Sequence, residues 1–170
     1  MRFPYTAVAA TRSLAPTLSL RLFNGENSVA VTGLVAVTGL VAVTGLVAVT
    51  GLVAVTGLVA VTGLVAVTGL LDSGAALNVL PYNIGLSLGA VWEEQTTSIP
   101  LVGNLAAFEA RALVIRAQIP ELPTSVVTLA FAWSQNPNIP IILGQINFFL
   151  EFNVCFYRAQ QVFDVTPRAI

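Results

Sequence analysis

The sequence contains no histidine and no lysine, and its single cysteine is Cys155. Because histidine is the commonest metal ligand and the usual base of serine and cysteine hydrolases, its absence disfavours a zinc site and a catalytic triad. One cysteine cannot form a disulfide within the chain, and we expect Cys155 to be a small buried apolar group in a strand. Charged residues make up only 9% of the chain and the net charge is -1, so no basic surface for nucleic acid is expected.

Hydrophobic residues are abundant, at 56% of 170 residues, which is enough for the core of one domain. No charged residue lies between Glu26 and Asp72, and this stretch is long enough to span a bilayer by hydropathy alone. Neither end carries a positive cluster or an aromatic belt, so a membrane segment is the weaker interpretation, although it stays open. The N-terminal apolar run is too short and interrupted for a secretory signal peptide, which favours the cytoplasm without fixing the location.

The hexapeptide Val-Ala-Val-Thr-Gly-Leu occurs seven times in succession from Val29 to Leu70. Its even period keeps each side chain on one face of an extended strand, whereas a helix would rotate every copy away from the previous one. Valine, threonine and the recurring glycine also disfavour helix, so we expect β-structure. A strand of this length would exceed the usual range. Stacked hairpins, a hexapeptide solenoid with about three copies per coil, and an extended two-stranded arm are all open, and we favour the hairpins or the arm.

The two ends of the repeat indicate where it entered the domain. If six copies are removed, the strand Thr17 to Leu22 is followed by a turn at Asn24-Gly25 and by a second strand made of the remaining copy. That second strand leads directly into Asp72. We therefore expect a single domain, residues 1–170, interrupted by an insertion of residues 29–70 in the hairpin before an Asp-Ser-Gly loop.

The segment from Leu70 to Pro81, Leu-Leu-Asp-Ser-Gly-Ala-Ala-Leu-Asn-Val-Leu-Pro, resembles the signature of retropepsin-like (retroviral-type) aspartic peptidases. A second segment, Ile139 to Phe149, is similar to the family's apolar-apolar-Gly motif, which ends a strand behind the catalytic loop and opens a short helix. The resemblance implies an all-β fold, a retropepsin-like closed β-barrel, here with a β-rich repeat expansion. It also implies one short helix near Gln145 to Phe152 and a C-terminal hairpin of Val154 to Tyr157 and Gln161 to Val165.

The resemblance implies a role for each motif. The catalytic residue is Asp72, and the residues that support its loop are Ser73, Gly74 and Ala75. The structural second motif consists of Ile142, Leu143 and Gly144. A flap that covers the substrate is expected as a hairpin between Ser98 and Arg116, with its tip at Val102, Gly103, Asn104 and Leu105. The chain has Gln145 where the family often has an arginine, so the family's local salt bridges are not expected here.

Two carboxylates about 3 Å apart can hydrolyse a peptide bond, because their mutual repulsion makes them share one proton. The ionised carboxylate takes a proton from the attacking water, while the protonated one donates a hydrogen bond to the peptide carbonyl. The chain has only two aspartates, Asp72 and Asp164, and Asp164 has no following Ser-Gly, so we expect it to be a surface carboxylate. The second carboxylate must then come from Asp72 of a second copy. We expect a homodimeric aspartic endopeptidase that acts on peptide or protein substrates and needs no metal or cofactor.

Two other classes of function stay open. One is a peptide-binding or scaffold protein that keeps the barrel but has no turnover. The other is a self-assembling or membrane-inserted protein dominated by the repeat, which is uncharged, proline-free and rich in valine, as β-stacking segments are. We expect five aromatic residues to be core or dimer contacts and not ligand platforms, namely Trp92, Trp133, Phe148, Phe149 and Phe152.

Overall fold

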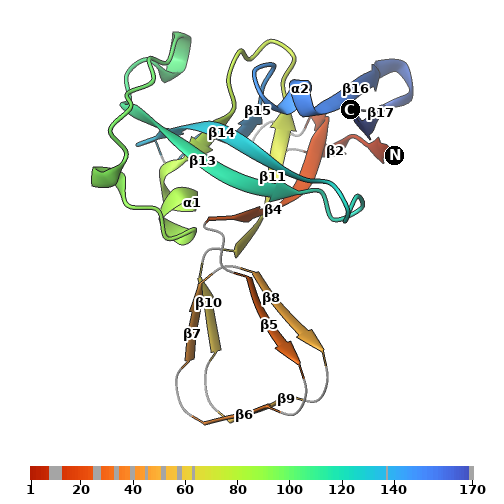
Figure 1. The fold of residues 1–170 in the computed structure, drawn as a ribbon. Helices are drawn as coiled ribbons and strands as arrows, with labels where there is room; N and C mark the ends of the chain where they lie inside the picture. Colours follow the sequence, from red (N-terminus) through yellow and green to blue (C-terminus); the bar gives the residue numbers. More distant parts are fainter. Residues whose placement is uncertain are drawn as a thin grey trace.

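The computed structural model describes residues 1–7, 13–24, 28–32, 35–38, 41–44, 46–50, 53–56, 59–62, 64–136 and 138–168. Six strands close into a barrel, so the predicted all-β closed barrel is confirmed (Figure 1). In order around the barrel they are β11 (Leu64–Leu71), β15 (Ile141–Leu143), β12 (Val79–Pro81), β14 (Val126–Ser134), β13 (Ala110–Gln118) and β4 (Thr17–Phe23).

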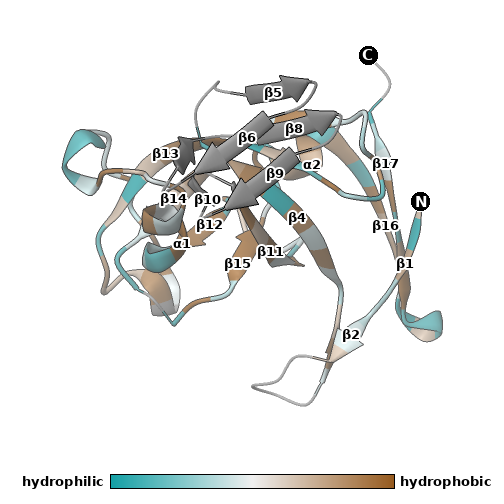
Figure 2. Cartoon of the chain, turned by 90° about the horizontal axis from the view of Figure 1, so that it is seen from below, coloured by the Kyte–Doolittle hydropathy of each residue, from teal (hydrophilic) through white to brown (hydrophobic). Residues whose placement is uncertain are grey.

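The barrel closes around a core because apolar residues alternate along its strands. In β4 every second side chain, Leu18, Leu20 and Leu22, is buried. In β13, Leu113 and Ile115 follow the same period of two, which turns one face of each strand inward. Figure 2 shows hydrophobic and hydrophilic segments alternating along β4. Each buried leucine contributes about 2 kcal/mol relative to an exposed one.

The aromatic residues that we expected to be core or dimer contacts lie largely in this core. Trp133 of β14 is fully buried, stacks on Tyr82 with ring centroids 5.5 Å apart, and meets Trp92 edge-on at 5.0 Å. Its indole Nε1 donates to the backbone carbonyl of Tyr82 at 3.0 Å, so the buried N–H has a partner. Phe148 and Phe152 are also buried.

The described part of the chain contains two short α-helices, whereas the sequence predicts one. The predicted helix is α2 (Phe148–Glu151), which is shorter than expected. The additional helix, α1 (Tyr82–Ser87), contains Asn83 and Gly85, both of which lower helix propensity. It forms against the barrel, where Gly85 allows a close approach: an added Cβ would lie 2.3 Å from the indole of Trp133. No helix in the described part of the chain is long and apolar enough to cross a membrane.

The repeat contains six short strands that pair in parallel. Val29 pairs with Val47, Val35 with Val53, and Val41 with Val59, so each strand pairs with the strand three hexapeptides further along. This is the register of a solenoid with three copies per coil, whereas neighbouring strands of a hairpin pair antiparallel, so the preference for hairpins or an extended two-stranded arm is wrong here (Figure 1). The strands are β5 (Ser28–Thr32), β6 (Val35–Thr38), β7 (Val41–Thr44), β8 (Leu46–Thr50), β9 (Val53–Thr56) and β10 (Val59–Thr62).

The two ends of the chain form a three-stranded sheet of β1 (Arg2–Pro4), β17 (Val162–Pro167) and β16 (Phe152–Tyr157). The antiparallel pairing of β16 with β17 is the predicted C-terminal hairpin. Thr6–Ala7 (β2) and Leu14–Ala15 (β3) make a further short antiparallel pair.

Cys155 is exposed on β16, so the expectation that it is buried is wrong. The strand lies at the edge of its sheet, and only its first residue, Phe152, is fully buried. Phe152 and Val154 pack toward the core, so Cys155, which alternates with them along the strand, points to the other face.

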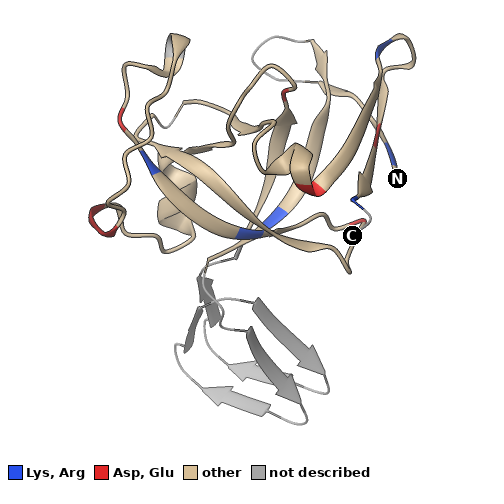
Figure 3. Cartoon of the chain, turned by 45° about the horizontal axis from the view of Figure 1, so that its top comes forward, with Lys and Arg blue, Asp and Glu red and all other residues tan. Residues whose placement is uncertain are grey.

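Charged residues are sparse over the described part of the chain (Figure 3). One pair joins the chain ends: the guanidinium of Arg2 donates from Nε and Nη2 to the two carboxylate oxygens of Asp164, at 2.7 and 2.9 Å. These hydrogen bonds, together with the positive charge, hold the pKa of Asp164 below its usual value.

Replacing Arg2 by glutamine is expected to raise the pKa of Asp164 toward its usual value, because the charged hydrogen bonds are lost. Since the pKa of Asp164 is lower in the folded chain than in the unfolded chain, the contact stabilises the sheet above the unfolded pKa and is lost as the pH falls through the folded pKa. NMR titration of the Asp164 carboxyl carbon measures the shift. An identical titration curve in R2Q would contradict the assignment.

Candidate active site

Asp72 lies where β11 ends and the chain turns away from the barrel. Its backbone N–H donates to the carbonyl of Leu143 at 3.0 Å, which extends the pairing of β11 with β15 by one residue. The N–H of Ala75 then donates to the carbonyl of Asp72 at 3.1 Å and closes the turn. Leu71 is buried and Asp72 is partly exposed, so the turn carries the carboxylate from the core to the surface.

The Asp72 carboxylate is oriented by its own loop. The backbone N–H of Gly74 donates to Oδ1 at 2.9 Å, an Asx-type turn that fixes the side chain. A Cβ on Gly74 would lie 3.2 Å from this oxygen, closer than an ordinary contact, so glycine suits the position. Among the described residues, no group donates a hydrogen bond to Oδ2. Ser73, next to Asp72, is exposed.

The strand β15 lies between β11 and β12, the two strands that flank the Asp72 loop (residues 72–78). Its register places Leu71 opposite Leu143 and Leu70 opposite Ile142. The structure therefore brings Asp72, Leu143 and Gly144 together, although the two segments are far apart in sequence.

Gly144 packs directly on the backbone of the Asp72 loop. A Cβ added to Gly144 would lie 2.4 Å from the carbonyl oxygen of Leu77 and 2.9 Å from that of Ala75, so only glycine fits without moving the backbone. The next two residues are hydrogen-bonded to the loop: Gln145 N–H donates to Ala75 at 2.9 Å and Ile146 N–H donates to Ala76 at 2.8 Å. The loop is thus held from behind by backbone contacts.

Gln145 occupies the position where the resembled family often has an arginine. Its side-chain Nε2 donates to the backbone carbonyl of Ser73 in the Asp72 loop. The neutral amide of Gln145 therefore links the segment after β15 to the Asp72 loop by a hydrogen bond, without a salt bridge.

Asn78 is a buried polar residue that the sequence analysis does not single out. Its Oδ1 accepts the N–H of Gly144 at 2.8 Å, and its Nδ2 donates to the carbonyl of Ala130 at 3.0 Å. Its backbone carbonyl also accepts the N–H of Ala132 at 2.9 Å. A lone asparagine inside the apolar run Leu77-Asn78-Val79-Leu80 is the signal that could have identified it, because a buried amide needs partners.

Replacing Asn78 by leucine is expected to destabilise the fold by about 2 kcal/mol or more, because the Gly144 N–H and the Ala130 carbonyl would lose their buried partner. Chemical denaturation measures the loss. The matched control is N83L, since Asn83 is exposed on α1 and a small effect is expected there. Equal stability of N78L and N83L would show that the Asn78 contacts are dispensable.

The predicted flap is paired only at its base. Ile99 N–H donates to Ala110 and Ala112 N–H donates to Thr97, each at 2.8 Å. Pro100 follows, and because proline has no N–H the ladder stops there. The prediction of a long hairpin from Ser98 to Arg116 is therefore wrong, since β13 pairs with β14 and β4.

The predicted tip forms a 3₁₀ turn, Gly103–Leu105, instead of a hairpin turn. Gly103 has φ 64°, a left-handed conformation that favours glycine. Val102 beside it is 84% exposed, so this tip is open to solvent.

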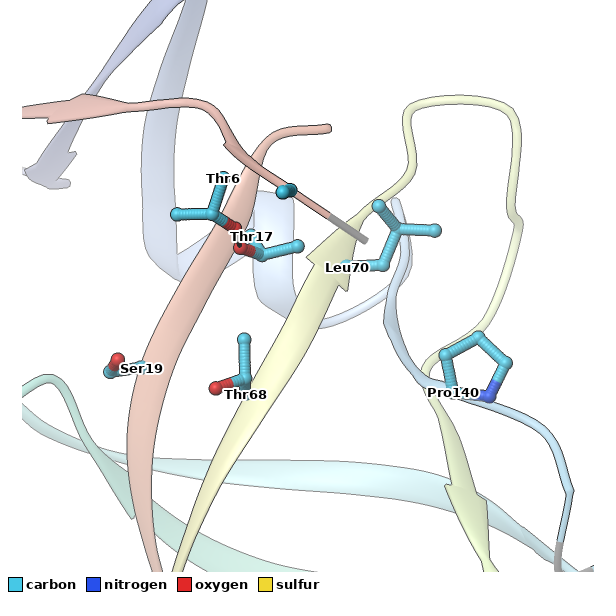
Figure 4. Close-up of a pocket in the computed structure, with 7 residues that line it drawn as sticks. Thr6, Thr17, Ser19, Thr68, Leu70 and Pro140 are labelled. Atoms are coloured by element: carbon cyan, nitrogen blue, oxygen red, sulfur yellow. Dashed lines mark hydrogen bonds between the residues drawn. The ribbon is translucent and has the colours of Figure 1, made fainter. Parts of the chain in front are cut away.

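A pocket of about 540 Å³ lies beside the end of β11 (Figure 4). Side chains alternate along a strand, so Thr68 and Leu70 lie on the same side of β11. Asp72, two residues after Leu70, continues this series just past the end of the strand. The pocket therefore opens on the face of β11 that leads to the carboxylate. Its lining residues are Thr6, Ala7, Thr17, Ser19, Thr68, Leu70 and Pro140.

The remaining candidates for chemistry lie elsewhere. Asp164 belongs to β17, in a different sheet, and is bound to Arg2, in agreement with its expected place at the surface. Among the described residues there is no group of three or more His, Cys, Asp or Glu that could hold a metal ion.

The chain is a closed β-barrel with a partly exposed Asp-Ser-Gly turn, and Gly144, which follows β15, packs against the loop of that turn. No family model and no curated protein matches the chain. Among solved structures the chain is similar to the crystal structure of a retropepsin-like aspartic protease from Rickettsia conorii, with 12% sequence identity and a TM-score of 0.47. The match covers 59% of this chain and 73% of that chain. Identity this low assigns no residue role to this chain.

Proposed function

We propose that the chain is an aspartic endopeptidase that hydrolyses peptide bonds as a homodimer, with one Asp72 from each subunit. The observation that carries the proposal is the Asp72 turn: a partly exposed carboxylate with one oxygen fixed by the Gly74 N–H, on a loop supported by Gly144. One such turn per chain supplies half of a two-carboxylate site. A two-fold axis through the face that carries the loop would supply the other half.

In the proposed dimer the two Asp72 carboxyl groups share one proton. The ionised group accepts a proton from the water that attacks the peptide carbonyl, while the protonated group donates a hydrogen bond to the carbonyl oxygen. The Gly74 N–H keeps Oδ1 of each carboxylate in position, and Oδ2 then faces the water or the partner carboxyl.

The Asp72 loop has the rigid support that a catalytic loop needs. Productive catalysis needs the reacting groups held to within a fraction of an ångström, because small misplacements cost large factors in rate. The Asp72 loop is tied to the segment after β15 by two backbone hydrogen bonds and by the side chain of Gln145. Asn78 locks the end of the loop to Gly144.

The direct test is cleavage of a broad peptide library at acidic to neutral pH, with and without a statine-type inhibitor. Cleavage that the inhibitor blocks supports the proposal. Binding of peptides without cleavage, at every pH tested, would instead support a peptide-binding protein with the same barrel.

A shortened chain tests whether the repeat is accessory. Deletion of residues 29–64 removes six of the seven copies and leaves the β4–β11 register from Leu22–Val65 to Thr17–Leu70, joined by residues 23–28. We expect this chain to be a dimer that cleaves the same peptides at a rate within about threefold, because the support of the Asp72 loop lies outside the deleted segment. Sedimentation and peptide assays measure both properties. Loss of assembly on deletion would favour a self-assembling protein dominated by the repeat.

A further inference from the structure

The pocket beside β11 has a polar wall that the cleavage mechanism does not use. Ser19 of β4 and Thr68 of β11 are register partners, so their side chains are neighbours on the outer face of the barrel. Thr17 and Leu70 form the next pair on the same face of these strands, and both also line the pocket. Figure 4 shows Ser19 and Thr68 on neighbouring strands, with Leu70 and Pro140 forming the apolar side.

The four hydroxyl groups of the pocket differ in their partners. The hydroxyls of Thr6 and Thr17 are hydrogen-bonded to each other. Those of Ser19 and Thr68 are exposed, and within the described part of the chain they bond to no other protein group. Each can donate one hydrogen bond and accept others. None of the described lining residues is charged.

We propose that this pocket selects a substrate side chain that ends in a carboxamide, glutamine or asparagine, with Ser19 and Thr68 as the specificity-determining residues. The proposal rests on the proposed function, because it requires a peptide that runs past Asp72. A carboxamide offers one acceptor oxygen and an N–H donor, which match a pair of adjacent hydroxyls. Among the described lining residues a carboxylate or ammonium would find no counter-charge, and an aliphatic side chain would cover both hydroxyls without bonding them.

The strand geometry also sets the distance of the selected residue from the cleaved bond. Thr68 lies four residues before Asp72 on the same side, about 13 Å away along an extended strand. An extended peptide alongside covers that distance in about four residues. The selected side chain therefore lies three or four residues from the scissile bond, and the aliphatic part of its stem packs on Leu70 and Pro140.

The test uses full-length D72N as a non-cleaving binder. Fluorescent peptides of otherwise identical sequence, which carry glutamine, methionine or glutamate at each position in turn, are titrated by anisotropy. The glutamine peptide is expected to bind at least about fivefold more tightly than the methionine peptide, and T68V or S19A each to reduce this preference by about fivefold. The matched control is T128V, which changes an exposed strand threonine outside the pocket and should leave the preference unchanged.

Three outcomes overturn the pocket assignment: no binding of any of the peptides, equal binding of the glutamine and methionine peptides, or a glutamine preference that survives in both T68V and S19A. The two proposals fail separately. If D72N shows the expected preference but the wild-type chain cleaves no peptide, the endopeptidase proposal falls and the pocket assignment stands. If the wild-type chain cleaves peptides without the preference, only the pocket assignment falls.

Discussion

Replacement of Asp72 by asparagine is expected to lower the rate of peptide cleavage by at least about 10³-fold. The amide keeps the size of the side chain, but it can neither take a proton from water nor share one with a partner carboxyl. The Gly74 N–H can still donate to the amide oxygen, so the loop should keep its conformation. The measurement is the steady-state rate on the best library peptide, alongside sedimentation to check assembly.

The chain offers a matched control in its other aspartate. D164N makes the same chemical change in β17, where the carboxylate contacts Arg2 and not the proposed site. Its cleavage rate should stay within about threefold of the wild-type rate, because exposed ion pairs contribute little. If D72N retained full activity, or if both variants lost activity equally, Asp72 would not be the catalytic group.

Replacement of Gly144 by alanine is expected to destabilise the fold by about 3 kcal/mol or more and to abolish cleavage. The new Cβ would lie 2.4 Å from the carbonyl oxygen of Leu77, so the backbone of the Asp72 loop must move. The movement would also break the hydrogen bond between Asn78 and the Gly144 N–H. Thermal and chemical denaturation measure the stability, and the peptide assay measures the loss of cleavage.

Variants at the next two positions, Gln145 and Ile146, test whether the loss of stability is specific to Gly144. Ile146 is 56% exposed, so I146A should change stability by less than about 1 kcal/mol. Q145A removes the side-chain contact with the Ser73 carbonyl and leaves the backbone contacts. Its effect on the cleavage rate should therefore be larger than its effect on the free energy of unfolding. A G144A chain as stable as the wild type would show that the loop does not rest on this glycine.

The strand β4 was predictable from local sequence because its alternation has a simple physical cause, whereas the closed barrel and its C-terminal hairpin were expected from the family resemblance. Leu18, Leu20 and Leu22 can share a face only in an extended chain. The placement of Gly144 beside the Asp72 loop could be expected only from a family resemblance, since no local pattern indicates that β15 threads between β11 and β12.

The features that the sequence did not predict depend on tertiary contacts. The helix α1 forms against Trp133 despite its poor propensity, and Cys155 is exposed because it points away from the face of its strand that packs on the core. In the repeat, the even period is the same for hairpins and for a solenoid. Local sequence therefore could not choose between antiparallel neighbours and parallel partners three copies away.

Mixing of subunits tests most directly whether two chains share one site. Wild-type and D72N chains are refolded together in varied proportions, at a constant total concentration, and the cleavage rate is measured. If each site needs Asp72 from both chains, the rate follows the square of the wild-type fraction, so an equal mixture retains about one quarter of the full rate. A rate that falls in direct proportion, to about one half, would show that each chain works alone and would contradict the shared carboxylate pair.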